Sequence, residues 1–191
     1  MSENLEIEFK TLLTETEFSQ TVNYFHLKET DFFTQNNYYF DSADFQLKER
    51  RFGLRVRTLA NNAEITLKIP DTDGLLEIND SLSVETAQHI VATQTLLDYG
   101  NVYDKLTSLG INKDNLRLIG SLTTKRAEKK LPQGLLALDE SWYNQKHDFE
   151  LELEVADAAV GRKDFLSLLN TLNIKESPAP NKIQRMMLSS N

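Results

Sequence analysis

The chain contains no cysteine among its 191 residues. It therefore forms no disulfide and offers no thiolate to a metal ion or to a nucleophilic reaction. Its first residues have neither the basic stretch nor the apolar core of a signal peptide. Because both observations suit a reducing compartment, we expect a cytoplasmic protein.

Long hydrophobic runs are also missing. No segment approaches the roughly 18 consecutive apolar residues that a membrane-spanning helix requires. Apolar residues make up 40% of the chain and charged residues 26%, as in an ordinary globular protein. We therefore expect a single domain over residues 1–191, with a sizeable core and no membrane partner.

Glycine and histidine are few and scattered. The seven glycines form no phosphate-binding loop of the GxGxxG or GxxxxGKS type. The histidines, at His26, His89 and His147, lack metal-ligand spacing, and we expect them to be structural or exposed. A net charge of −8 disfavours DNA and anionic membranes as partners. It leaves room for a small anionic ligand in a locally basic pocket.

What the chain does contain is a repeated alternation of charged and apolar residues, which begins at residues 5–10 (LEIEFK). Successive side chains of a strand point to opposite faces, so Glu6, Glu8 and Lys10 share one face. Two carboxylates followed by an ammonium can hold a divalent cation and a phosphate together. The first strand therefore predicts a metal and phosphate site.

The same alternation recurs along the chain. One explanation is an antiparallel sheet with one wet face. However, like charges two residues apart repel unless a charge of opposite sign lies between them. The other explanation is a closed barrel whose charged interior holds a cation and an anion. The residues on charged faces are Arg55 and Arg57; Glu64, Thr66 and Lys68; Glu77; Thr124 and Arg126; Asp139 and Ser141; and Glu150, Glu152 and Glu154.

The pattern of elements predicts an α+β fold with about eight strands, mostly in antiparallel hairpins, forming a large curved sheet or barrel. Thr14 and Glu17 form a capping box that starts the first helix, which we expect to end near residue 26. Further helices are expected at 83–99, 102–109, 162–172 and 181–188. Besides the first strand, strands are expected at 38–41, 52–59, 64–69, 75–79, 116–121, 122–129, 135–141 and 149–155.

The charged residues divide by chemistry into two groups. Hard cations such as Mg²⁺ prefer carboxylate oxygens, which Glu6, Glu8, Glu152 and Glu154 offer. Arginine suits bidentate phosphate recognition and lysine acts as a point charge on phosphate. The residues that offer these groups are Arg55, Arg57, Lys68 and Arg126. Phosphoryl transfer needs mainly positioning and charge neutralisation, so no protein nucleophile is required.

The ordered set of motifs resembles that of CYTH domains, the triphosphate tunnel metalloenzymes. The resemblance starts with the ExExK pattern at residues 6–10 and covers essentially the whole chain. Its length and the segment 74–79 are most similar to the small single-domain branch of Gram-positive bacteria. The other matching segments are Tyr39-Phe40-Asp41, residues 54–57, Thr66-Leu67-Lys68, Glu77, Thr124-Lys125-Arg126, Leu138-Asp139, residues 150–154, and Lys182 with Arg185.

The resemblance implies an eight-stranded antiparallel barrel with helices outside, which binds triphosphate-containing small molecules with Mg²⁺ or Mn²⁺. It implies metal ligation by Glu6, Glu8, Glu152 and Glu154, with Asp139 joining them, and catalytic roles for Glu6, Glu8, Lys10, Glu152 and Glu154. Phosphate binding is implied for Arg55, Arg57, Lys68, Arg126 and Lys182. Supporting roles are expected for Glu77, Glu150 and Arg185.

Several alternatives stay open at this point. A metal-dependent triphosphatase is the first hypothesis, an adenylate cyclase that converts ATP to cyclic AMP and pyrophosphate is the second, and a noncatalytic polyphosphate or nucleotide-binding module is the third. The metal pair is either Glu150 and Glu152 or Glu152 and Glu154. The substrate, the preferred metal and the presence of a homodimer are not fixed by the sequence.

Overall fold

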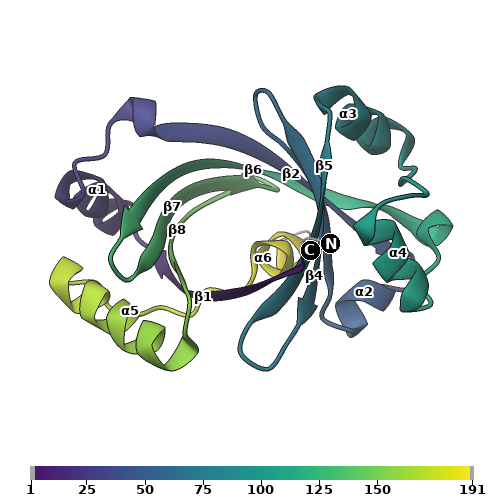
Figure 1. Ribbon diagram of the computed structural model, residues 1–191. Coiled ribbons are helices and arrows are strands. Elements are labelled where there is room, and N and C mark those ends of the chain that lie inside the picture. The colour runs from purple at the N-terminus through teal and green to yellow at the C-terminus, as the bar shows by residue number, and fades with distance from the viewer. Residues whose placement is uncertain (1–2, 190–191) are drawn as a thin grey trace. The chain divides into compact units, whose positions relative to one another are not determined.

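The structure is a computed structural model that describes residues 3–189, shown in Figure 1. Its eight strands form a closed antiparallel barrel in the order β1-β5-β4-β3-β2-β6-β7-β8. The strands are β1 (Glu3–Leu13), β2 (Phe32–Ser42), β3 (Gly53–Thr58), β4 (Ala63–Pro70), β5 (Leu75–Leu82), β6 (Leu116–Leu131), β7 (Gly134–Tyr143) and β8 (Lys146–Val155). The predicted fold class is therefore confirmed.

Six α-helices and two short 3₁₀ helices accompany the strands in residues 3–189. None of the helices within this range is long and apolar enough to span a membrane. The helices are α1 (Glu15–Tyr24), α2 (Gln46–Glu49), α3 (Val84–Thr93), α4 (Asn101–Ser108), α5 (Ala158–Leu172) and α6 (Lys182–Leu188), with η1 (Glu29–Asp31) and η2 (Lys113–Asn115).

The predicted capping box at the start of α1 is present. The Thr14 hydroxyl accepts a hydrogen bond from the Glu17 backbone N–H, and the Glu17 carboxylate accepts one from the Thr14 backbone N–H at 2.7 Å. The helix ends at Tyr24, two residues earlier than expected. His26 follows it with a φ of 54°, outside the helical region.

Several predicted elements differ in extent from the structure, among them the strand expected at 38–41, which is the much longer β2 (Phe32–Ser42). The helix expected over 83–99 stops at Thr93, because Gln94 turns left-handed and its side-chain oxygen accepts a hydrogen bond from the Leu118 backbone N–H at 3.2 Å. The two strands expected at 116–121 and 122–129 are a single strand, β6. Serine at position 121 does not interrupt the strand.

The chain divides into two compact units. The first contains residues 35–122 and the start of β1 up to Leu5. Its core joins apolar residues of β3, β4 and β5 to buried residues of α3 and α4, among them Ile90 and Leu106. Leu54 and Val56 lie in this core. Because side chains alternate along β3, Arg55 and Arg57 lie on the opposite face of the strand.

The second unit contains residues 6–34 and the chain from Thr123 onward. Leu151 and Leu153 of β8 pack with Phe165 and Leu169 of α5 in its core. Glu150, Glu152 and Glu154 alternate with them and therefore lie on the face turned away from that helix.

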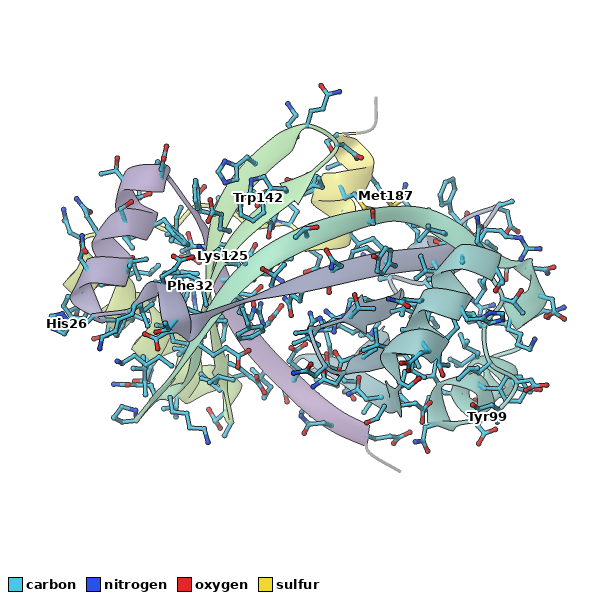
Figure 2. All side chains as sticks on the ribbon, turned by 90° about the horizontal axis from the view of Figure 1, so that it is seen from above. His26, Phe32, Tyr99, Lys125, Trp142 and Met187 are labelled. Atoms are coloured by element: carbon cyan, nitrogen blue, oxygen red, sulfur yellow. The ribbon has the colours of Figure 1, made fainter. Side chains whose placement is uncertain are left out.

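Strand β6 obeys the same alternation. The Lys125 ammonium lies 5.2 Å from the centre of the Phe32 ring and pairs with Glu29. Lys125 and Phe32 are labelled in Figure 2. Thr124 and Arg126 point to the other face. In both units, then, the apolar faces meet helices and the charged faces lie opposite.

Candidate functional site

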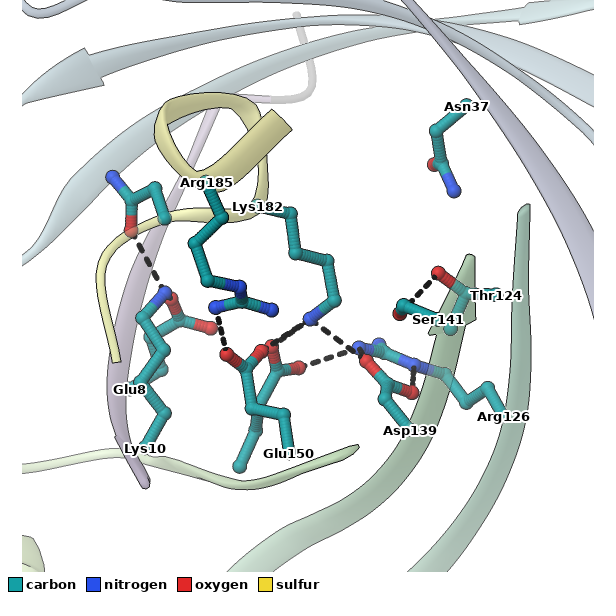
Figure 3. A network of polar contacts seen from close by, with 12 residues as sticks. Glu8, Lys10, Asn37, Thr124, Arg126, Asp139, Ser141, Glu150, Lys182 and Arg185 are labelled. Atoms are coloured by element: carbon teal, nitrogen blue, oxygen red, sulfur yellow. Dashed lines mark hydrogen bonds and ion pairs between the residues drawn. The ribbon is translucent and has the colours of Figure 1, made fainter. Parts of the chain in front are cut away.

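The second unit gathers three buried carboxylates on its charged face (Figure 3). One oxygen each of Asp139, Glu150 and Glu152 lies within 4.8 Å of the others. Asp139 on β7 is directly opposite Glu150 on β8, and Glu152 follows two residues later on the same face. These three residues are called the acidic cluster below. Its oxygen atoms are of the kind and spacing that suit a hard divalent cation.

Arg126 neutralises one side of the acidic cluster. It is directly opposite Asp139 in the pairing of β6 with β7. Its Nε and one terminal nitrogen donate to the two Asp139 oxygens at 2.7 and 2.6 Å, and the same terminal nitrogen contacts Glu152 at 2.5 Å. A planar guanidinium matches a carboxylate in this two-point manner. The predicted phosphate-binding arginine is thus held by two predicted metal ligands.

Lys182, the first residue of α6, lies among all three carboxylates. Its Nζ is 2.8 Å from Asp139 Oδ2 and 2.6 Å from Glu152 Oε1, and it also contacts Glu150 Oε1. A protein ammonium therefore makes the contacts that a metal ion would make with the same oxygen atoms. This arrangement supports the fit of the cluster to a cation.

Arg185, one turn further along α6, ties the helix to β8. It contacts Glu150 Oε2 at 2.5 Å, Asp148 Oδ2 at 2.9 Å and the Pro180 carbonyl at 2.6 Å. Asp148 also accepts a hydrogen bond from the Tyr143 hydroxyl at 2.5 Å. Asp148 was not among the predicted site residues, although its position two residues before Glu150 places it on the same face of β8.

The predicted first-strand residues lie beside this network. Lys10 Nζ is 2.5 Å from Glu8 Oε1 and 2.8 Å from Asn181 Oδ1. In the pairing of β1 with β8, Lys10 is opposite Glu152 and Glu8 is opposite Glu154. Asn181, which was also missed, thus connects β1 to the residue that precedes α6.

The pKa values of the acidic cluster are pushed apart. Burial raises the pKa of Glu150 to about 7, with Lys182 opposing the shift and the neighbouring Glu152 adding to it. Burial also disfavours the Glu152 carboxylate, but Lys182 and Arg126 outweigh it and hold its pKa well below the ordinary value. The same two cations outweigh burial at Asp139 and lower its pKa. A proton on Glu150 thus relieves the repulsion within the cluster.

The first unit carries the remaining predicted basic residues. Arg55 and Arg57 each have a terminal nitrogen 3.4 Å from the same Glu64 oxygen. These contacts are longer than good charge-assisted hydrogen bonds. The guanidiniums are therefore only loosely held by Glu64.

Lys68 lies 2.7 Å from Glu77, its direct neighbour across β4 and β5. Burial raises the pKa of Glu77, but Lys68 and Arg55 outweigh it and lower the pKa overall. The supporting role predicted for Glu77 is thus matched by a direct contact with a predicted phosphate ligand.

The structure brings together most of the predicted residues within each unit. In the second unit these are Glu8, Lys10, Arg126, Asp139, Glu150, Glu152, Lys182 and Arg185. The acidic cluster contains the Glu150 and Glu152 pair rather than Glu152 and Glu154. Glu6 precedes the β1 residues that pair with β8, and it and Glu154 lie outside the cluster. The metal roles of all the predicted ligands, Glu6, Glu8, Asp139, Glu152 and Glu154, stay predictions.

Two other features are separate from the charged faces. A cavity of about 200 Å³ lies on the helix side of the second unit, beside Tyr24, Leu131 and Leu168, and none of the predicted site residues lines it.

Asp41, part of a matching motif, accepts hydrogen bonds from the backbone N–H groups of Ser42, Leu47 and Lys48. Those contacts give Asp41 a structural role at the start of α2.

Comparisons with known proteins extend over nearly the whole chain. A family model described as CYTH domain matches residues 4–187. A Bacillus subtilis (strain 168) protein named "Putative triphosphatase YjbK" is 40% identical over 185 residues, which are 97% of this chain and 95% of that protein.

Solved structures show the same fold. The crystal structure of "a putative adenylate cyclase (bh2851)" from Bacillus halodurans has a TM-score of 0.92 at 38% identity, covering 97% of this chain and 98% of that one. A Hippeastrum protein, HpAC1, described as an adenylyl cyclase candidate with a dominant triphosphatase activity, has a TM-score of 0.82 at 22% identity, covering 96% of each chain. The second likeness supports the fold alone.

Proposed function

The chain belongs to the CYTH domain family, and from that premise we propose that it is a metal-dependent hydrolase of triphosphate-containing small molecules. The observation that carries the proposal is the acidic cluster of Asp139, Glu150 and Glu152 with the buried cations Arg126 and Lys182 around it. Burying so many charges is costly unless they serve each other or a ligand. When a cation and a phosphate chain bind, the cation would pair with the carboxylates and the phosphates would pair with Arg126 and Lys182, in place of the present ion pairs.

The acidic cluster would form the core of the metal site, with Glu8 joining it from β1 and Glu6 and Glu154 as the outer predicted ligands. Mg²⁺ or Mn²⁺ suits these carboxylate oxygens. Such a cation, when bound, would neutralise the phosphate chain and favour ionisation of a water molecule. The residues themselves supply buried carboxylate oxygens that Arg126 and Lys182 hold in place and neutralise in the absence of a ligand.

The basic residues would bind and orient the phosphates. Arg55, Arg57 and Lys68 in the first unit, and Arg126 and Lys182 in the second, offer donors to phosphate oxygens. In the reaction, a water oxygen bonds to the terminal phosphorus and the anhydride bond breaks, which yields phosphate and the shortened chain. Most of the acceleration would come from positioning and charge neutralisation. Lys10, held by Glu8 and Asn181, would order the acidic end or contact phosphate.

A cyclase is the second candidate, because the Bacillus halodurans relative carries an adenylate cyclase name. In that reaction the ribose 3′-oxygen bonds to the α-phosphorus of ATP and pyrophosphate leaves. A noncatalytic binding module is the third candidate. We favour hydrolysis because the Bacillus subtilis relative carries a triphosphatase name. The charged faces also account for binding of a phosphate chain, which needs no pocket for a nucleobase.

We also propose that residues 1–191 act as one domain, since the family model spans residues of both units. A cytoplasmic location suits a chain with no cysteine. The proposed partner is a small triphosphate, without membrane or DNA, and a homodimer stays open.

The test is phosphate release from tripolyphosphate, ATP and thiamine triphosphate with Mg²⁺ or Mn²⁺. Glu152→Gln and Glu8→Gln should each lower kcat at least tenfold, whereas Glu15→Gln, at an exposed position on α1, should leave it unchanged. Full turnover by Glu8→Gln would show that Glu8 of β1 is not a required metal ligand. Cyclic AMP produced from ATP would favour the cyclase, and tight binding without turnover at any metal concentration would favour the binding module.

A further inference from the structure

Three buried polar atoms on the charged face of the first unit have no hydrogen-bond partner in the described part of the chain. They are Asn37 Nδ2, Arg55 Nε and Thr66 Oγ1. Asn37 and Thr66 are each only 1% exposed. Buried polar groups are nearly always paired, so an unpaired group requires a specific explanation. Here three occur together.

The three residues lie on neighbouring strands. Asn37 on β2 is directly opposite Arg57 on β3, and Arg55 on β3 is directly opposite Thr66 on β4. All three alternate with core residues such as Leu54 and therefore share the charged face. Directly opposite residues such as Arg55 and Thr66 lie about 5 Å apart, and diagonal neighbours such as Asn37 and Arg55 about 7–8 Å apart, so the three residues form one patch across three strands.

The Asn37 side chain is held in one orientation. Arg57 Nε donates to Asn37 Oδ1 at 2.8 Å. This contact assigns the oxygen to Arg57, and the amide nitrogen, which can only donate, is left to face another group. By binding the Asn37 oxygen, Arg57 orients the Asn37 amide so that its uncharged N–H donor lies beside the Arg57 guanidinium.

The chemistry of the patch selects an anion. An amide nitrogen and a guanidinium Nε donate hydrogen bonds and accept none, and the Thr66 hydroxyl can donate as well. A metal ion would be repelled by Arg55 and would find no carboxylate among the three. Glu64 is the acidic neighbour of Arg55 and Arg57, but its contacts with them are 3.4 Å long. The oxygen atoms of one phosphate group or phosphate chain could accept hydrogen bonds from all three groups.

We infer that Asn37 and Thr66 are substrate-binding residues that donate hydrogen bonds to phosphate oxygens beside Arg55. The inference rests on the proposed function and deepens it. It adds two uncharged donors to the five predicted basic residues. Such donors fix the position of individual oxygens, whereas long-range charge mainly attracts the chain.

Thr66→Val is the cleanest test, because valine keeps the shape and removes only the unpaired hydroxyl. Tripolyphosphate affinity in EDTA, measured by calorimetry on the full chain, should fall about 5- to 20-fold. The melting temperature of the free protein should stay the same or rise, because no hydrogen bond is lost. KM for tripolyphosphate with Mn²⁺ should rise by a similar factor.

Thr124→Val is the matched control. Thr124 is also a fully buried threonine on a charged face, but its hydroxyl is 3.0 Å from the Ser141 hydroxyl, as Figure 3 shows. This variant should lower the melting temperature and keep the affinity for tripolyphosphate. Thr66→Val is thus expected to lower the affinity and Thr124→Val the melting temperature.

Asn37→Asp provides a second variant that keeps an oxygen for Arg57. It replaces the unpaired donor by a charged acceptor, so affinity for tripolyphosphate should fall at least tenfold while the free protein stays folded.

Unchanged affinity and KM in both Thr66→Val and Asn37→Asp would overturn the inference, as would an equal loss in Thr124→Val. If wild type neither binds nor hydrolyses tripolyphosphate, the proposed function fails as well. If wild type does both and the variants match it, the inference alone fails.

Discussion

The side-chain nitrogen of Lys182 lies 2.8 Å from Asp139 Oδ2 and contacts the other two carboxylates of the acidic cluster. The residue that neutralises the cluster thus comes from α6, at the far end of the sequence. Burial disfavours its ammonium, but the three carboxylates outweigh it and raise the Lys182 pKa well above the ordinary value. Lys182 is therefore charged at any pH at which the cluster is ionised.

Lys182→Met should make the stability of the protein depend on divalent metal. Removing one partner of a buried ion pair leaves uncompensated charge and typically costs about 3–5 kcal/mol. In EDTA we expect a loss of this order in urea unfolding. Mn²⁺ should restore much of it, because a cation can replace the ammonium among the three carboxylates.

Lys163→Met, at an exposed position on α5, is the control and should behave as wild type in both conditions. An equal Mn²⁺-induced rise in melting temperature for wild type and Lys182→Met would contradict the prediction. It would mean that metal does not occupy the position that Lys182 leaves.

Glu150 should make the metal-free protein less stable as pH rises. Its pKa is raised from 4.5 to about 7, so the folded state holds a proton that the unfolded state releases between these values. Its contribution is fully present below pH 4.5 and is lost as pH rises through 7. The Asp139 and Glu152 contributions have the opposite sign and are lost only as pH falls below their ordinary values.

Urea unfolding of wild type and Glu150→Gln between pH 4.5 and 8 tests this assignment. The difference in unfolding free energy between the two proteins should change on the order of 3 kcal/mol across the window, in favour of wild type at low pH. A constant difference would show that Glu150 does not titrate there.

The alternation of residue types predicted the strands and their charged faces, and the family resemblance was needed to choose a closed eight-stranded barrel over an open sheet. Strand β3 has core residues at Leu54 and Val56, each followed by an arginine, and this alternation is present in the structure. The end of α3 could not be predicted, because no glycine or proline follows Thr93. The chain turns left-handed at Gln94, whose side chain bonds to the distant Leu118 backbone.

The candidate site was predictable in residue type but not in pairing. Glu150, Glu152 and Glu154 share one face of β8, so parity cannot choose between them. The pairing with β7, which sets Asp139 opposite Glu150, determines which of these carboxylates join the acidic cluster. Asn181 was missed for a related reason: its partner Lys10 is 171 residues away.

Arg126→Lys should be damaging although it conserves charge. Lysine is a point charge and cannot contact both oxygens of Asp139 as the guanidinium does at 2.7 and 2.6 Å. We expect a loss of about 2–4 kcal/mol in unfolding free energy and a higher KM for tripolyphosphate.

Arg162→Lys is the control, because Arg162 also contacts both oxygens of a carboxylate. Arg162 also makes a two-point contact, through its two terminal nitrogens with Glu176 at 2.7 and 2.8 Å, but its side chain is 41% exposed. Surface pairs are worth about 0–1 kcal/mol, so this variant should be nearly neutral. If the two replacements lower the unfolding free energy equally, burial of the Arg126 pair does not make its contribution larger than that of a surface pair.

Asp41→Ala should lower stability without changing catalysis by the folded protein. Asp41 is 1% exposed and accepts hydrogen bonds from three backbone N–H groups, of Ser42, Leu47 and Lys48, at 2.7, 2.9 and 3.0 Å. Alanine would leave these donors unsatisfied at the start of α2, at a cost of about 3 kcal/mol. Urea unfolding should show this loss, and kcat for tripolyphosphate at a temperature where the variant is folded should equal that of wild type. A fall in kcat with normal stability would instead place Asp41 in the reaction, and its presence in a family motif would then reflect catalysis rather than the anchoring of α2.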